Sequence, residues 1–371
     1  MIIGILKERF TDEQRVVLSP SGVEALVEAG AQVYIESDAG ADARFTNEQY
    51  QESGATIVYS PEEATRRADI VMKVMPPEKE EYEWIADGKM LMCFQLLGME
   101  KRAYVDYLLE HQITAIGYEL IKDSQGAFPI LRGMSEISGH IATLIGARML
   151  RSDLGGRGVL LSGMAGVAPA CVVILGAGAS GFSAAQAAIG LGAQVIMLDN
   201  NLDQLRAADQ YFGKHITTVM SSPENLRRGC RIADVFIGAI SIDEDMDHHL
   251  ISEEMVMSMK SGAVLVDVSI NQGGCAETSR PTTIKEPTFV KHGVIHYCVP
   301  NIPSVVARTS TYALTNGLLP HMLEIARTGI QNTLETNEGI RCGIITHDGQ
   351  PTHKLLTDLY GITVTPLGNC N

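Results

Sequence analysis

The sequence predicts an α/β protein built from two doubly wound domains with a cleft between them. Short apolar runs typical of buried strands alternate with helical stretches over residues 1–130, and a second such series begins at Val172. This alternation is typical of mostly parallel sheets covered by helices on both faces. A glycine-rich turn at 176–181 follows the first strand of the second series. A turn of this kind between a strand and a helix indicates that the domains are Rossmann-like.

Individual elements follow from local signals. A helix is expected over 21–29, because Ser19 and Pro20 suit its N-cap and first helical position. Apolar residues at helical spacing predict further helices over 135–150 and 311–326. The glycine-rich stretch 155–166 is loop-like, with 159–161 as a candidate short strand. Strands are expected at 2–6, 32–36, 70–74, 90–94 and 114–117 in the first series, and at 172–175, 195–199, 235–238 and 264–268 in the second.

The glycine-rich turn predicts a dinucleotide site. Gly176 permits the tight turn, Gly178 lets the backbone approach a pyrophosphate, and Gly181 lets the helix pack on the strand. Ala179 and Ser180 open that helix, whose N-terminus favours negative charge. The next strand ends at Asp199, where a carboxylate can accept hydrogen bonds from the adenosine ribose and repel a 2′-phosphate. The pattern therefore favours NAD over NADP; the alternative is a glycine-rich turn in an unrelated α/β domain.

The order of these patterns predicts how the domains are divided. The segment after residue 305 is too short for its own domain and is expected to complete the first one. The substrate (catalytic) domain is therefore expected to comprise 1–130 plus 305–371, and the NAD-binding domain 131–304. Helical crossovers near 135–150 and 305–325 would act as hinges. The substrate is expected in the cleft between the domains, a common place for ligands.

Composition excludes several classes of partner. Of the 371 residues 45% are hydrophobic, and the net charge of −15 comes without any basic cluster, so neither nucleic acid nor a membrane surface is an expected partner. No apolar stretch reaches the roughly 18 residues of a membrane span. The N-terminus does not resemble a signal peptide. Seven cysteines without C-x-x-C pairs argue against a disulfide framework and a zinc site, and indicate a cytoplasmic location.

Ordered segments along nearly the whole chain resemble one family. They are Lys7-Glu8, Glu13-Gln14-Arg15-Val16, Ser19-Pro20 with Gly22-Val23, Lys73-Val74, Met134-Ser135-Glu136, 155–161, the turn at 176–181, Asp267-Val268, 272–275, 280–283 and 308–316. With them the chain resembles NAD-dependent alanine dehydrogenases and, more distantly, the NAD-binding domain of proton-pumping transhydrogenases. The resemblance implies two Rossmann-like domains, NAD as cofactor and a homo-oligomer, a hexamer or a dimer. It also implies oxidative deamination of a small amino acid to a 2-oxo acid, in either direction.

Such a reaction needs specific groups around its substrate. One cation must hold the substrate carboxylate, a second must polarise the carbonyl oxygen, and an acid/base pair must move protons. The family supplies an arginine in an E-x-R-V motif, a lysine in a K-V-K-E-P motif, a histidine after the strand near residue 95 and an aspartate in D-Q-G-G. Here Arg15 is retained to hold the carboxylate, and Lys73, the first lysine of its motif, is a candidate to share that role. Met75, Leu96 and Asn271 stand where the second lysine, the histidine and the aspartate are expected.

Three replacements in well-matched segments indicate a change of function or its loss. The leading hypothesis is an NAD(H)-dependent oxidoreductase that acts on a small amino acid, imino acid or 2-oxo acid, with substrate or chemistry altered from L-alanine. The alternative is an NAD(H)-binding regulatory or catalytically inactive homologue.

Other residues are candidates for the missing proton chemistry or for ligand contacts. Glu119 and His140 are candidate catalytic groups, although Glu119 is equally suited to orienting its neighbours and His140 to hinge packing. Ser135, Ser221 and Asn301 lie where family members contact cofactor or substrate. The acidic stretch 243–249 resembles a hard-metal site but is better explained as a solvated loop, so no metal is expected.

Overall fold

The computed structural model describes residues 1–240 and 249–367. It divides into two compact units. One comprises Met1–Met134 with Ser304–Asn371, and the other comprises Ser135–Pro303.

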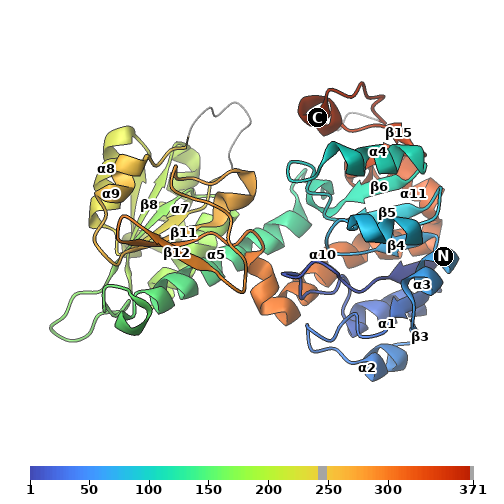
Figure 1. Cartoon of the computed structure of the whole chain (residues 1–371), viewed down its shortest axis with the longest axis horizontal. Helices are drawn as coiled ribbons and strands as arrows, with labels where there is room; N and C mark the ends of the chain where they lie inside the picture. Colours follow the sequence, from blue (N-terminus) through green and yellow to red (C-terminus); the bar gives the residue numbers. More distant parts are fainter. Residues whose placement is uncertain (241–248, 368–371) are drawn as a thin grey trace. The chain divides into compact units, whose positions relative to one another are not determined.

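Helical segments carry the chain across the boundaries of the units. The first crossing falls within helix α5 (Pro129–Met149), the expected crossover at 135–150. The return falls within the 3₁₀ helix η6 (Ile302–Val306), which leads into the long helix α10 (Ala307–Thr328; Figure 1). In the part of the chain that the structure describes, no helix combines the length and hydrophobicity needed to cross a bilayer.

The sheet of the first unit has the strand order β15-β14-β6-β5-β4-β1-β2-β3. Strands β1 to β6 are parallel, and β14 and β15 extend one edge in antiparallel pairing. The order reverses between β1 and β4, and this switch point is where ligands bind in doubly wound sheets. The strands are β1 (Ile2–Ile5), β2 (Gln32–Glu36), β3 (Thr56–Val58), β4 (Ile70–Met72), β5 (Met90–Cys93), β6 (Thr114–Gly117), β14 (Ile344–His347) and β15 (Gln350–Pro351).

Local signals explain the helices of this unit. Ser19 caps α1 (Pro20–Glu28) as predicted, and its Oγ accepts the N–H of Gly22. A Cβ on Gly22 would lie 2.4 Å from Thr315 Cγ2, so the glycine permits the close approach of α1 to α10. The other helices are α2 (Asn47–Glu52), α3 (Pro61–Arg67), η1 (Lys79–Trp84), α4 (Arg102–Glu110), η2 (Tyr118–Leu120), α11 (Ile330–Thr336), α12 (Glu338–Cys342) and α13 (Leu355–Tyr360).

The sheet of the second unit has the order β12-β13-β11-β10-β7-β8-β9. All its strands are parallel except the edge strand β12, and the order reverses between β7 and β10. This is the Rossmann order with one added antiparallel edge. The strands are β7 (Cys171–Leu175), β8 (Gln194–Asp199), β9 (Ile216–Met220), β10 (Val235–Gly238), β11 (Val264–Asp267), β12 (Thr288–Lys291) and β13 (Val294–Tyr297). The helices are η3 (Ser152–Leu154), α6 (Ala179–Gly190), α7 (Leu202–Phe212), η4 (Gly213–His215), α8 (Pro223–Ile232), α9 (Glu253–Met257) and η5 (Val268–Gln272).

Both faces of this second sheet are buried. Val172 and Ile174 of β7 point into one apolar cluster, and Val173 and Leu175 point into the other. A strand that is covered on both faces needs apolar residues at every position, which explains its continuous hydrophobic run. The predicted fold class, two Rossmann-like α/β units, is confirmed.

Some local expectations were wrong. Residues 159–161 form no strand; the nearby chain makes one isolated bridge, between Met164 and Val167, beside glycines with positive φ. Five described cysteines are free and buried. Strands β3, β9, β12, β13, β14 and β15 had no predicted counterpart, because each has only two to five residues or includes polar residues that resemble a loop.

Candidate functional site

The glycine-rich turn lies directly after β7, at the switch point of the second sheet. Gly176 has φ +106°, and a Cβ there would lie 2.2 Å from the carbonyl oxygen of Ala239. A Cβ on Gly181 would lie 1.9 Å from the carbonyl oxygen of Gly176. At both positions, therefore, the protein's own backbone excludes any side chain.

Gly178 differs from these two glycines. It is the N-cap of α6, no side chain caps the helix there, and a Cβ on it would meet no atom within 4 Å. The fold itself therefore does not require glycine at this position. A bound pyrophosphate would require it, because the phosphates must approach the backbone and the N–H groups that open α6.

Asp199 ends β8 beside this turn. Its Oδ2 accepts the N–H of Ala177 at 2.6 Å, and its Oδ1 accepts the N–H of Asn201 at 2.7 Å. Its carbonyl oxygen accepts the N–H of Ser221, which follows β9. The carboxylate is only partly buried and is held at the edge where a ribose would lie. The turn, the helix N-terminus and this acid together fit a dinucleotide such as NAD.

The other residues predicted for this unit occupy the same sheet edge or helix α5. Asn271 lies in η5 after β11 with an exposed side chain, and Asn301 is buried beyond β13. Ser135 is partly buried in α5, and His140 is exposed on the same helix. Asn271, Ser221 and Asn301 thus follow parallel strands, as Asp199 and the glycine-rich turn do, whereas His140 does not.

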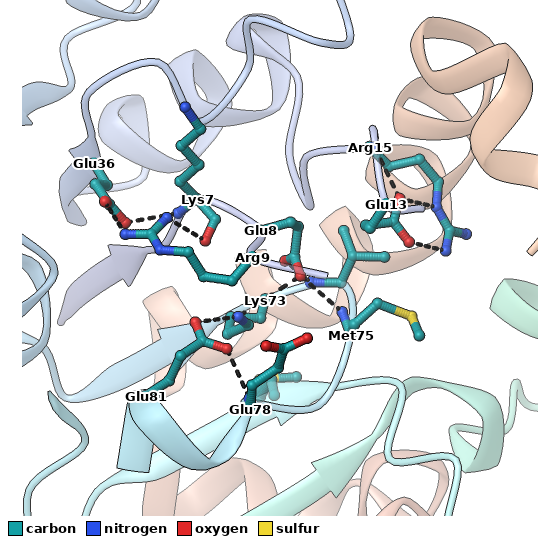
Figure 2. Close-up of polar contacts among 12 residues, drawn as sticks. Lys7, Glu8, Arg9, Glu13, Arg15, Glu36, Lys73, Met75, Glu78 and Glu81 are labelled. Carbon is teal, nitrogen blue, oxygen red and sulfur yellow. Dashed lines mark hydrogen bonds and ion pairs between the residues drawn. The ribbon is translucent and has the colours of Figure 1, made fainter. Parts of the chain in front are cut away.

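Arg15 lies in the loop that follows β1 of the first unit. The side chains of Arg15 and Glu13 are both buried, and they form a fork in which Nε and Nη2 donate to the two carboxylate oxygens at 2.7 and 2.6 Å (Figure 2). Nη1 lies 3.2 Å from Met134 Sδ, and the guanidinium lies 5.8 Å from the centre of the Phe94 ring. Glu13 therefore both neutralises and orients the predicted carboxylate clamp.

The backbone around Arg15 is held by hydroxyl groups from a distant part of the chain. The N–H of Gln14 donates to Ser304 Oγ at 2.8 Å, and that of Val16 donates to Thr311 Oγ1 at 3.2 Å. The loop is thus attached to η6 and α10 on both sides of Arg15. The motif at 308–316 is recognisable in the sequence, but no local pattern indicates its pairing with the loop at 14–16.

Lys73 follows β4 and is almost completely buried. Its Nζ donates to Glu81 Oε1 at 2.5 Å and lies 3.7 Å from Glu8 Oε2 (Figure 2). Burial disfavours the ammonium, but Glu8 and Glu81 outweigh burial and hold the pKa of Lys73 above its ordinary value. Lys73, predicted as a substrate residue, is therefore engaged by two carboxylates that sequence reasoning missed.

Glu8 and Glu119 are partly buried residues whose carboxylates lie beside positions 75 and 96. Glu8 accepts the N–H groups of Val74 at 2.6 Å and Met75 at 3.3 Å. Glu119 accepts the N–H groups of Gln95 and Leu96, each at 2.9 Å. Burial raises the pKa of each of these glutamates to about 7, although the backbone N–H groups, and Lys73 in the case of Glu8, oppose this rise.

These shifts predict how stability depends on pH. A carboxyl with an ordinary pKa of 4.5 that rises to about 7 on folding binds its proton more tightly in the folded state. Its contribution to stability is complete below pH 4.5 and is lost as the pH rises through about 7. We expect the unfolding free energy of wild type, relative to Glu119→Gln, to fall by up to about 3 kcal/mol between pH 5 and 7.5. Urea unfolding at several pH values measures this difference, and a pH-independent difference would contradict it.

The acidic stretch weighed as a metal site lies outside the described residues, apart from His249. His249 Nδ1 lies 2.8 Å from the carbonyl oxygen of Gly274. Within residues 1–240 and 249–367, no cluster of three or more histidine, cysteine, aspartate or glutamate residues is arranged to hold a metal ion.

The doubly wound sheets and the glycine-rich turn define the class of protein: an α/β protein with a dinucleotide-binding fold. Family models described as "Alanine dehydrogenase/PNT" match the chain, the N-terminal domain at residues 4–138 and the C-terminal domain at 142–354. An alanine dehydrogenase of Methanococcus maripaludis is 42% identical over 99% of this chain and 98% of its own length. One of Bacillus subtilis is 41% identical over 99% and 96%. The chain belongs to the alanine dehydrogenase/PNT family.

Solved structures agree with this assignment. One described as L-alanine dehydrogenase superposes with a TM-score of 0.92 at 37% identity, covering 97% of this chain and 99% of its own. A transhydrogenase from Sinorhizobium meliloti, at 21% identity and a TM-score of 0.81 over 96% of this chain and all of its own, shows the shared fold. The prediction of an NAD(H)-dependent oxidoreductase is confirmed by this family membership.

Proposed function

We propose that the chain transfers hydride between NAD(H) and a small amino acid, imino acid or 2-oxo acid, with a substrate or chemistry altered from that of L-alanine dehydrogenases. The observation that carries this proposal is the set of side chains beyond β1, β4 and β5. These neighbouring parallel strands lead to Arg15, Met75 and Leu96 at one sheet edge. A carboxylate-binding cation is retained there, while the two positions expected to carry a lysine and a histidine are apolar.

Each group has a separate part in this proposal. Arg15, oriented by Glu13, binds the substrate carboxylate and so directs the reacting carbon. NAD, when bound, supplies the hydride acceptor or donor. Lys73 pairs with Glu8 and Glu81 and so acts on the position of the loop that leads to Met75. Asn271 lies in the unit Ser135–Pro303, at the position where the family aspartate is expected. An asparagine cannot carry a proton as that carboxylate would, so Glu119 and His140 are the candidate proton carriers.

Apolar side chains at 75 and 96 favour a particular class of substrate. A methionine and a leucine cannot donate a proton to, or place a positive charge beside, a carbonyl oxygen. They do suit a substrate that carries more apolar surface or develops less charge during hydride transfer. We therefore infer a 2-oxo acid or imine with an apolar side chain.

Purified protein is expected to oxidise NADH with at least one member of a panel of 2-oxo acids with ammonia or an amine. Restoring the family residues provides the matched test. The variant carrying Met75→Lys, Leu96→His and Asn271→Asp is expected to oxidise alanine at least about a hundredfold faster than wild type. General acid–base groups typically increase a reaction rate by that factor. NADH absorbance follows both reactions.

The outcomes separate the two candidate functions. If wild type turns over no substrate and the restored variant oxidises alanine, the chain is an NAD(H)-binding protein that has lost its chemistry. That alternative is favoured by the same apolar pair, Met75 and Leu96. If the restored variant also fails, the assignment of positions 75, 96 and 271 to the substrate is wrong.

We also propose that the chain forms a homo-oligomer. The turn between η3 and β7 exposes Leu160, Met164 and Val167 by 64%, 69% and 60%, although large apolar side chains are costly in water. Sedimentation should give a multiple of the 40.1 kDa chain mass, and Met164→Glu should lower it. The control is Tyr59→Glu, at an exposed aromatic of the other unit, which should leave the mass unchanged. A wild type that sediments as a single chain would refute the proposal.

A further inference from the structure

The segments that follow β4 and β5 share an arrangement that gives Glu8 and Glu119 a part beyond the one they have in the proposed function. In each, a partly buried glutamate accepts two consecutive backbone N–H groups, those of Val74 and Met75 for Glu8 and those of Gln95 and Leu96 for Glu119. Each glutamate follows the strand that neighbours the one it holds, since β1 pairs with β4 and β6 pairs with β5. We call the pair the carboxylate clips.

The clips act where strand pairing ends. The N–H of Lys73 donates to the carbonyl oxygen of Met92, and that of Phe94 donates to the carbonyl oxygen of Val74. Beyond these bonds the two segments separate, and the N–H groups of the buried residues Val74 and Gln95 need other acceptors. Glu8 and Glu119 supply these acceptors, and a carboxylate binds an N–H more strongly than a carbonyl does.

The clip at Leu96 holds an unfavourable conformation. Leu96 has φ +44°, in the left-handed region that branched and bulky residues rarely adopt. Its carbonyl oxygen accepts the N–H groups of Met99 and Glu100, so the residue forms a tight turn. Strain of this kind persists only where surrounding contacts impose it, and it concentrates at functional sites.

The glycine at position 117 leaves space for the carboxylate of Glu119. A Cβ on Gly117 would lie 3.1 Å from Glu119 Oε2 and 3.3 Å from Gln95 Cγ. Any side chain at position 117 would therefore press on the clip. The clip at Met75 is anchored differently, because Lys73 Nζ lies 3.7 Å from the same Glu8 oxygen that accepts the N–H of Met75.

We propose that Glu8 and Glu119 are positioning residues that fix the backbone at positions 75 and 96, so that whatever side chains stand there are presented to the substrate in one geometry. This inference rests on the proposed function, in which the substrate binds at this edge of the sheet. It explains how the family's lysine and histidine positions can be exchanged for methionine and leucine while the surrounding backbone keeps its hydrogen bonds.

Glu8→Gln and Glu119→Gln test the proposal, and each is the matched control of the other. Amide hydrogen exchange should accelerate at least tenfold at Val74 and Met75 only in Glu8→Gln, and at Gln95 and Leu96 only in Glu119→Gln. Glu110→Gln, an exposed carboxyl at the end of α4, should change neither pair. Exchange that accelerates equally over both pairs in both variants would show a general loss of stability and overturn the proposal.

Ligand affinity separates positioning from stability. With NADH saturating, each clip variant should bind pyruvate about tenfold more weakly, while its affinity for NADH stays within twofold of wild type. If amide exchange accelerates locally in a clip variant but its affinity for pyruvate is unchanged, the positioning role is overturned. If wild type itself binds neither pyruvate nor a 2-oxo acid with a longer apolar side chain, the inferred substrate class fails, whereas the exchange experiment still decides whether the clips fix residues 75 and 96.

Discussion

Arg15→Ala is expected to bind pyruvate about a hundredfold more weakly than wild type, because truncating one partner of a buried, hydrogen-bonded charge pair costs roughly 2–5 kcal/mol. Its affinity for NADH should be unchanged, since the dinucleotide residues belong to the other unit. Arg15→Lys should recover only part of the affinity, because an ammonium cannot form the fork of a guanidinium. Calorimetric titration with NADH and then with pyruvate measures both constants.

The fork with Glu13 makes a control necessary. Arg15→Ala removes the guanidinium from the Glu13 carboxylate, whose side chain is 0% exposed, and breaking a buried ion pair destabilises a protein by about 3–5 kcal/mol. The double variant Glu13→Gln with Arg15→Met removes both charges at similar volume and should fold more stably than Arg15→Ala. It should bind pyruvate as weakly. Equal losses of NADH and pyruvate affinity in this double variant would contradict the role assigned to Arg15.

Gly178→Val is expected to lower the affinity for NADH at least about a hundredfold while leaving stability nearly unchanged. A Cβ at this position meets no atom within 4 Å, and the residue has φ −72° and ψ −171°, which valine adopts readily. Substitutions that disturb no contact usually change stability by less than about 0.5 kcal/mol. The new side chain would instead occupy the space that the pyrophosphate needs.

Gly181→Ala is the matched contrast. Its Cβ would lie 1.9 Å from the carbonyl oxygen of Gly176, a contact between backbone atoms that no side-chain movement relieves. This variant should lose stability by about 3 kcal/mol or more, together with its affinity for NADH. Fluorescence titration with NADH and thermal unfolding separate the two effects. If Gly178→Val binds NADH as wild type does, the dinucleotide site is misplaced.

Several features of this chain were predictable because they depend on residues close together in the sequence. The cap of α1 needs only Ser19 and the helix it precedes, and the turn after β7 needs only glycines at fixed spacing. Asp199 could be placed because a parallel strand directs its last residue to the same edge as the preceding turn. Buried strands were recognisable by continuous apolar runs, whereas β9, partly exposed, and β15, two residues long, lack that signal.

The chemistry around the candidate site depends on contacts that no local pattern encodes. Lys73 could be identified from its motif, but its engagement by Glu8 joins residues 65 positions apart, through two adjacent strands. The loop bearing Arg15 depends on hydroxyls about 290 residues away, Ser304 and Thr311. Leu96 is recognisable in the sequence only as an apolar residue after a strand; its positive φ and its bond to Glu119 arise from the packing of β5 against β6.

From the sequence alone came the class of fold and the cofactor, because backbone geometry and motif spacing are local properties. Only the tertiary structure decided which carboxylates neutralise Arg15 and Lys73 and which ones hold positions 75 and 96. The physical reason is burial: a charge or an N–H group removed from water must find its partner in space, wherever the chain brings one near.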